Sequence, residues 1–265
     1  MILGENRRYR YTINPLVEVI CQLRFPAILS IDTREPADFQ EAVREFFPRY
    51  DPKTEQPAPK ISGINTAAPR VEPQPAVKNY NFVSEDGLWR LNLTRNFLAL
   101  STRRYTTWED FAAQLDRALA AFIEIYRPAF FERAGLRYVN AFSRSAIGMP
   151  DAPWRELIRE PFLGLLSSAD AEHFKMNRAS TDTELDLDDG IHLKLHTGPG
   201  QVRSAGAPQQ ATETVFLFDA DFSVSGNIHL PDVINRLESM HLNSTRLLRA
   251  AVTDTLHNAL GPEVL

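Results

Sequence analysis

The sequence predicts an α+β fold in which a curved antiparallel sheet packs against long helices. Two hairpins have turn residues and apolar alternation that agree on one register each. Further runs alternate with a period of two, and two long segments carry an apolar stripe at helical spacing. Hydrophobic residues make up 43% of the 265 residues and charged residues 24%, which is typical of a folded globular protein.

The first predicted strand runs from Pro15 to Phe25, because its odd positions are apolar and its even positions are largely polar. A short amphipathic helix is expected between Pro36 and Pro48. Prolines are dense over 48–75, so we expect a long surface loop there, within which Lys60 to Ile64 could still pair as a strand.

Residues 80–103 predict a three-stranded meander. Asp86-Gly87 and Arg95-Asn96 supply the two turns, and only one register keeps the apolar side chains of all three strands on one face. The expected facing pairs are Tyr80 with Leu93, Phe82 with Leu91, Ser84 with Trp89, Leu93 with Leu98, and Leu91 with Leu100.

A helix over 107–126 is expected to cover this face, since Thr107 and Asp110 resemble a capping box and an apolar stripe follows. A strand from Leu136 to Phe142 and a short helix from Pro153 come next.

The second hairpin turns at Gly190, with a three-residue loop. It pairs Leu187 with Ile191, Asp186 with His192, Leu185 with Leu193, and Glu184 with Lys194.

Residues 197–214 are rich in Gly, Pro, Ser, Gln and Ala and have no apolar period, which predicts a mobile connection. Alternation returns over 216–224 as a last strand. A long helix is then expected from Pro231 until Gly261 and Pro262 terminate it.

The order of elements occurs twice, as tandem β-α-β(3-4)-α units over 1–134 and 135–265. We expect the two halves to form one compact unit. By analogy, such an arrangement is TBP-like or helix-grip-like, an analogy that carries no function.

Charge and cysteine content narrow the function classes. A net charge of −5 gives no global positive field for nucleic acid. The single cysteine, Cys21, falls on the inner face of the first strand and predicts a buried, inert thiol. Neither a signal-peptide pattern nor a membrane-length apolar run is present, so we expect a cytoplasmic protein that does not associate with membranes.

His192 and His196 lie on one predicted strand face with Asp182, Glu184 and Asp186. A salt-bridge ladder is the favoured interpretation, because four strand residues span about 13 Å and cannot converge on one ion. We therefore predict no metal site and no cofactor.

Three segments carry a family resemblance: PLVEVICQLRF at Pro15 to Phe25, LWRLNLTRNFLALSTRRYTTWEDF at Leu88 to Phe111, and ERAGLRYVNAF at Glu132 to Phe142. Together they resemble a sporadically distributed, uncharacterised prokaryotic family with PLVEV…LRF and GLRYxN signatures. The resemblance implies a bacterial cytoplasmic protein, with a defence or toxin link suggested by the patchy distribution alone.

The leading functional hypothesis is a non-catalytic binding protein with an unidentified protein partner, or a homodimer, because no catalytic motif is found. An enzyme or small-molecule binder is the alternative, with a pocket between the sheet and the long helices lined by Arg90, Asn92, Arg137, Asn140 and His241. His241 and Asn243 interrupt the last helix, where a kink or cap is favoured over a cleft. Nucleic-acid binding through Arg7, Arg8 and Arg10 is a third, disfavoured hypothesis.

Overall fold

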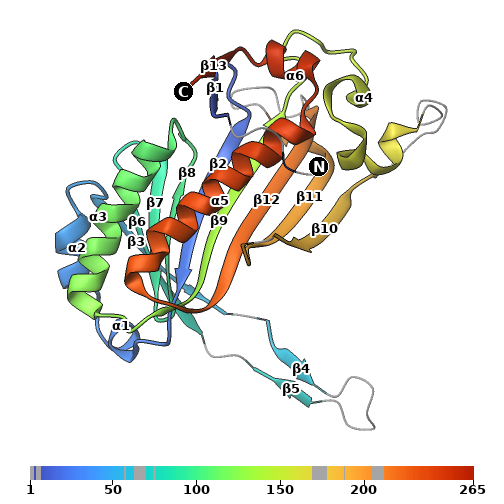
Figure 1. Ribbon diagram of the computed structural model, residues 1–265. Coiled ribbons are helices and arrows are strands. Elements are labelled where there is room, and N and C mark those ends of the chain that lie inside the picture. Colours follow the sequence, from blue (N-terminus) through green and yellow to red (C-terminus); the bar gives the residue numbers. More distant parts are fainter. Residues whose placement is uncertain are drawn as a thin grey trace.

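A computed structural model of the protein describes residues 3, 7–56, 58–62, 70–73, 76–168, 178–187, 189–203 and 212–265. Its centre is a nine-stranded sheet in which all neighbours are antiparallel (Figure 1). The strands are β2 (Leu16–Arg24), β3 (Arg49–Glu55), β6 (Val77–Val83), β7 (Trp89–Thr94), β8 (Phe97–Thr102), β9 (Phe131–Phe142), β10 (Thr181–Asp186), β11 (His192–Arg203) and β12 (Thr212–Ile228).

The strand order is β10-β11-β12-β9-β2-β8-β7-β6-β3. The first long strand of each half, β2 and β9, therefore pair at the centre of the sheet. Each of these strands has a meander from its own half on its outer side, β8-β7-β6 beside β2 and β12-β11-β10 beside β9.

Both predicted hairpin registers are confirmed. Tyr80 faces Leu93 and Leu91 faces Leu100 in the first meander. In the second hairpin Asp186 faces His192, and Gly190 has a φ of 76°, the left-handed conformation that its turn requires. Local turn chemistry and alternation were sufficient here because both act between residues that are close in sequence.

One strand departs from its predicted alternation. The register of β2 against β9 shifts between Leu16 and Glu18, which marks a β-bulge. The side chain of Val17 is consequently 43% exposed, whereas Val19, Cys21 and Leu23 are fully buried as expected. The bulge turns Leu16 toward the helical side, where it packs against the core.

The helices α2 (Ala37–Val43), α3 (Trp108–Tyr126) and α5 (Leu230–Ala251) pack on one face of the sheet (Figure 1). The predicted cap of α3 is confirmed, since the Thr107 hydroxyl accepts a hydrogen bond from the Asp110 amide. The smaller helical segments are α1 (Leu29–Thr33), α4 (Trp154–Leu157), the 3-10 turns η1 (Glu160–Phe162) and η2 (Gly164–Ser167), and α6 (Asp254–Ala259).

Three expectations about where regular elements begin and end are wrong in part. Within 48–75, Arg49–Glu55 forms the edge strand β3, where Pro52 is tolerated because an edge strand leaves one side unpaired. Within 197–214, β11 continues to Arg203 and β12 begins at Thr212, while 204–211 lie outside the described residues. The last helix ends at Ala251, and Thr253 caps a separate helix, α6.

Two short ladders lie outside the main sheet. β1 (Tyr9–Tyr11) pairs with β13 (Pro262–Val264), and β4 (Lys60–Ser62) pairs with β5 (Arg70–Glu72). The second ladder projects away from the rest of the protein (Figure 1). Among the described residues, no helix has the length and apolar character needed to cross a membrane.

Candidate functional site

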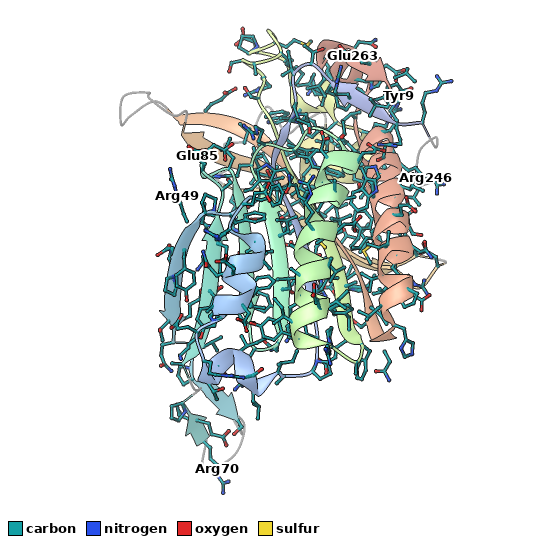
Figure 2. All side chains as sticks on the ribbon, turned by 90° about the vertical axis from the view of Figure 1, so that its left-hand side faces the viewer. Tyr9, Arg49, Arg70, Glu85, Arg246 and Glu263 are labelled. Carbon is teal, nitrogen blue, oxygen red and sulfur yellow. The ribbon has the colours of Figure 1, made fainter. Side chains whose placement is uncertain are left out.

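A pocket of about 100 Å³ lies at the end of the sheet where β1 and β13 meet the start of α3. Figure 2 shows Tyr9 and Glu263 together at this end of the protein. The walls of the pocket come from the β1 segment, the turn before α3, β9, β12 and one face of α5. The residues that line it include Arg8, Tyr9, Arg10, Tyr11, Leu16, Tyr105, Trp108, Tyr138, Asn140, Phe218, His241, Ser244, Leu248 and Arg249.

The pocket is built around His241, which projects from the middle of α5. Its Nδ1 atom is 2.9 Å from the hydroxyl oxygen of Tyr138 on β9. Its ring stacks on the indole of Trp108, with centroids 4.9 Å apart and planes 7° from parallel. These two contacts fix the imidazole between the sheet and α3.

Burial and the nearby Arg8 guanidinium lower the pKa of His241 to about 4, so the imidazole is neutral at neutral pH. A neutral imidazole uses one nitrogen as donor and the other as acceptor. Among the described residues, Nε2 of His241 has no hydrogen-bond partner although it is buried. Leaving such an atom unsatisfied costs about 1–3 kcal/mol.

Asn140 is the second buried polar side chain of the pocket and is only 3% exposed. Its Nδ2 donates to the Phe218 carbonyl at 3.3 Å, which leaves Oδ1 as a hydrogen-bond acceptor. Within the part of the chain that the structure describes, this oxygen also has no partner. Two residues that line the pocket thus each carry a buried polar atom with unused hydrogen-bonding capacity.

The β1 segment, which lines the pocket, is held in place by ion pairs and an edge ladder. Arg8 donates to both carboxylate oxygens of Glu109, at 2.7 and 2.9 Å. Arg10 contacts Glu263 on β13 at 2.5 Å. Tyr11 shares a hydrogen bond of 2.9 Å with Nδ1 of His257 on α6.

The predicted site residues divide between the two faces of the sheet. Asn140 and His241 line the pocket together with Arg8 and Arg10. The helix α5 is continuous through His241, so the helix end that a cap would require does not occur there. His241 instead lines the pocket. Asn243, which was predicted with it, instead contacts Asp189 at 3.4 Å.

The remaining candidates do not line the pocket. Alternation along β9 turns Arg137 away from Tyr138 and Asn140, onto the outer face, the sheet face opposite α3 and α5. Arg90 is exposed on that face, and Asn92 donates there to the side chains of Asn79 and Asn81. Arg7 is exposed and does not line the pocket.

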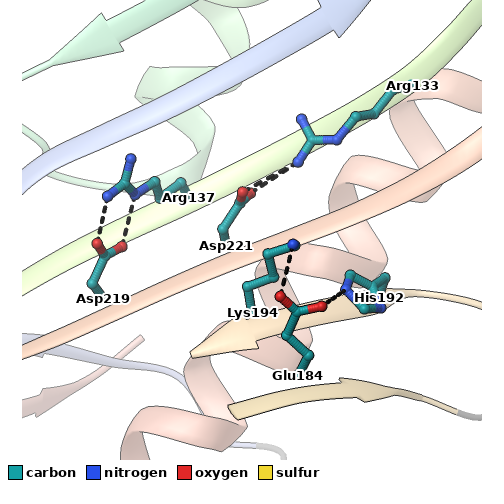
Figure 3. Close-up of polar contacts among 7 residues, drawn as sticks. All are labelled: Arg133, Arg137, Glu184, His192, Lys194, Asp219 and Asp221. Carbon is teal, nitrogen blue, oxygen red and sulfur yellow. Dashed lines mark hydrogen bonds and ion pairs between the residues drawn. The ribbon is translucent and has the colours of Figure 1, made fainter. Parts of the chain in front are cut away.

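The outer face carries paired charges (Figure 3). Arg137 contacts Asp219 at 2.5 and 2.7 Å, and Arg133 lies 3.2 Å from Asp221. The predicted ladder on β10 and β11 is confirmed: Glu184 contacts Lys194 and His192, Asp186 contacts His192, and Asp182 contacts His196. No group of three or more potential ligands for a metal ion occurs among the described residues.

Sequence reasoning missed most of the aromatic wall. Tyr105 and Trp108 flank the cap of α3, and no sequence pattern indicates that they line a pocket. Ser244 and Leu248 follow His241 at helical spacing, which is the one local signal that could have indicated a shared face. The role of β1 depends on pairing with residues more than 250 positions away, which no local pattern predicts.

Comparison with known proteins adds no assignment, since neither a protein-family model nor a curated protein matches the chain.

Proposed function

We propose that this protein is a non-catalytic binding protein that holds a small molecule in the pocket between β9, α3 and α5. The observation that carries the proposal is the pair of buried, unpartnered polar atoms, Nε2 of His241 and Oδ1 of Asn140, in one aromatic pocket. Ligand pockets combine apolar and aromatic walls with a few polar groups that fix the ligand's orientation. A ligand that reaches these two buried atoms would satisfy both.

Binding rather than catalysis is favoured by the acid–base properties of the site. General acid–base catalysis works best with a pKa near the operating pH. The pKa of His241 is about 4, and burial raises the pKa of Tyr138 well above its usual value. Neither group therefore changes protonation state near neutral pH.

Thermal unfolding in the presence of a small-molecule extract tests the proposal, since a ligand that binds only the folded state raises the unfolding temperature. We expect the extract to stabilise the wild type but not His241→Phe, which keeps a ring against Trp108 and removes both nitrogens. Asn235→Leu, at an exposed position of α5 outside the pocket, is the control and should respond like wild type. Equal responses of wild type and His241→Phe would contradict the proposal.

A protein partner is a second candidate, favoured by the outer face of the sheet. Half-buried Ile20, Val139 and Leu217 form an apolar strip there between paired charges. We propose that a partner covers this strip. A copurifying protein that is lost in Val139→Glu but kept in Asn235→Leu would support this candidate, and a protein that remains bound to both variants would exclude the strip as its site.

Nucleic-acid binding through the β1 segment is the weakest of the three candidates. Arg8 and Arg10 already pair with Glu109 and Glu263, so neither guanidinium is free to neutralise a phosphate. Absence of binding to single- and double-stranded DNA and RNA at low salt would exclude this candidate.

We also propose that the two halves are an architectural duplication with TBP-like geometry. The central pairing of β2 with β9, and the placement of each meander outside its own first strand, support this proposal. In such a duplication α3 and α5 occupy equivalent places, and the pocket lies between them.

A further inference from the structure

We infer that the ligand of the pocket is an uncharged, planar aromatic ring that carries a carboxamide-like edge with one donor and one acceptor. This inference rests on the proposed function and specifies its ligand class. Four properties of the pocket carry it: its aromatic walls, its two unpartnered polar atoms, its compensated charges and its volume.

The walls favour a flat ring. Aromatic side chains enter from three separate segments: Tyr9 and Tyr11 from β1, Tyr105 and Trp108 from the start of α3, and Tyr138 from β9. Tyr105 and Tyr138 meet edge to face with centroids 5.9 Å apart. Aromatic rings pack on one another in offset-stacked or edge-to-face arrangements, so a further ring fits such walls better than an alkyl chain does.

The unpartnered atoms specify the polar edge of the ligand. Oδ1 of Asn140 can only accept, so the ligand must offer a donor there. If the Tyr138 hydroxyl donates to Nδ1 of His241, then Nε2 is the donor and requires an acceptor on the ligand. A carboxamide offers an N–H and a carbonyl side by side, and it therefore satisfies both residues in this tautomer.

Charge compensation favours an uncharged ligand over an anionic one. Each of the three guanidinium groups around the pocket already contacts a carboxylate: Arg8 contacts Glu109, Arg10 contacts Glu263, and Arg249 contacts Asp254. The pocket therefore has no surplus positive charge to offset the burial of a ligand's carboxylate or phosphate, which is costly without a partner.

The volume limits the ligand, or the part of it that is buried, to about one ring. The pocket measures about 100 Å³, which is less than the roughly 150 Å³ of an apolar cavity that accommodates benzene, so it encloses one ring at most. Larger substituents would have to extend out of the pocket.

Calorimetric titration with matched probes tests the ligand class. Benzamide and nicotinamide present a flat ring with a carboxamide, benzoate replaces the amide by a charge, cyclohexanecarboxamide removes planarity, and toluene removes the polar edge. We expect the two aromatic amides to bind at least about tenfold more tightly than the other three, a difference of about 1.4 kcal/mol. Asn140→Leu should weaken benzamide binding by a similar factor, and Asn235→Leu should leave it unchanged.

The possible failures are distinguishable. If benzoate or cyclohexanecarboxamide binds as tightly as benzamide, the inferred ligand class is wrong. The proposal that the pocket binds a small molecule is then unaffected. If no probe binds but the extract still stabilises wild type and not His241→Phe, the class is again wrong and the proposed function stands. If neither the probes nor the extract distinguish wild type from His241→Phe, both the ligand class and the proposed function are overturned.

Discussion

Tyr138 and His241 are 103 positions apart in the chain, and the phenol oxygen of one lies 2.9 Å from Nδ1 of the other. Both side chains are buried, and the bond joins the central strand β9 to the middle of α5. It also sets the orientation of the imidazole that stacks on Trp108. The same contact therefore serves the packing of α5 on the sheet and the shape of the pocket.

Tyr138→Phe should destabilise the fold by about 1–3 kcal/mol, because it leaves the second ring nitrogen of His241 buried without a partner. Urea unfolding measures the change. Tyr126→Phe is the matched control, since among the described residues the hydroxyl of Tyr126 has no hydrogen-bond partner, and we expect a change within about 0.5 kcal/mol. Equal effects of the two substitutions would show that the Tyr138–His241 bond contributes nothing measurable.

Stability should fall as the pH is lowered from about 6.5 to about 4, and His241 should account for part of the loss. Its pKa is about 4 in the folded state against about 6.5 in the unfolded chain, so the unfolded state binds more protons in this window. The slope that His241 contributes is at most about 1.4 kcal/mol per pH unit.

The comparison with His241→Phe isolates this contribution, because His257, whose pKa is also lowered, titrates in both proteins. Unfolding measured between pH 6 and pH 4.5 also avoids Glu109, whose ion pair is lost only as the pH falls from about 4.5 toward its lowered pKa of about 2. Parallel stability curves for wild type and His241→Phe would contradict the assignment of a buried, neutral imidazole.

Glu109→Gln should loosen the β1 segment without unfolding the protein. The substitution removes the two charge-assisted bonds from Arg8, but the Glu109 side chain is 62% exposed, so the free energy of unfolding should fall by only about 0.2–1 kcal/mol. Amide hydrogen exchange of Arg10 and Thr12, whose N–H groups point toward the β13 segment, should accelerate while that of β2 stays unchanged.

The control for this prediction is Glu41→Gln, which removes an exposed helical ion pair to Arg44 far from β1 in the sequence. It should leave exchange in β1 as in wild type. If exchange of Arg10 and Thr12 is the same in both variants, Arg8 and Glu109 do not hold the segment in place.

Gly198→Ala should be among the most damaging single substitutions in the second half of the sheet. Gly198 has a φ of 148°, and a Cβ there would lie 2.5 Å from the carbonyl oxygen of Ala179. Gly148 also has a positive φ, 73°, but a Cβ there would meet nothing within 4 Å.

We therefore expect Gly148→Ala to cost about 1–2 kcal/mol, from backbone strain alone. Gly198→Ala should cost clearly more, because the backbone of 179–180 must also move. Thermal unfolding of the two variants measures the difference, and a smaller loss for Gly198→Ala than for Gly148→Ala would contradict the close packing of β11 against 179–180.

Much of the local fold could be predicted from the sequence, because turns and alternation act over short distances. The registers about Gly87 and Gly190 and the cap at Thr107 are examples. The bulge at Val17 could not be predicted, since it depends on how β2 pairs with β9 more than 110 residues away. The edge strand β3 was missed because Pro52 weakens a strand pattern yet is tolerated at an edge.

The pocket could be predicted only in fragments. Asn140 and His241 were recognised as polar residues within apolar patterns, but nothing local indicates that β9 and α5 meet at this point. Arg137 was grouped with them although alternation places it on the opposite face. The interleaved cations and aromatics of the β1 segment suggest the disfavoured nucleic-acid arm, because the carboxylate partners of Arg8 and Arg10, Glu109 and Glu263, are remote in sequence.

Native mass spectrometry of the gently purified protein tests the central claim most directly. We expect the wild type to carry one small, uncharged molecule per chain, and the double variant Asn140→Leu/His241→Phe to carry none while remaining folded. The same retained mass on both proteins, or a bare wild-type chain that the small-molecule extract does not stabilise, would contradict the account.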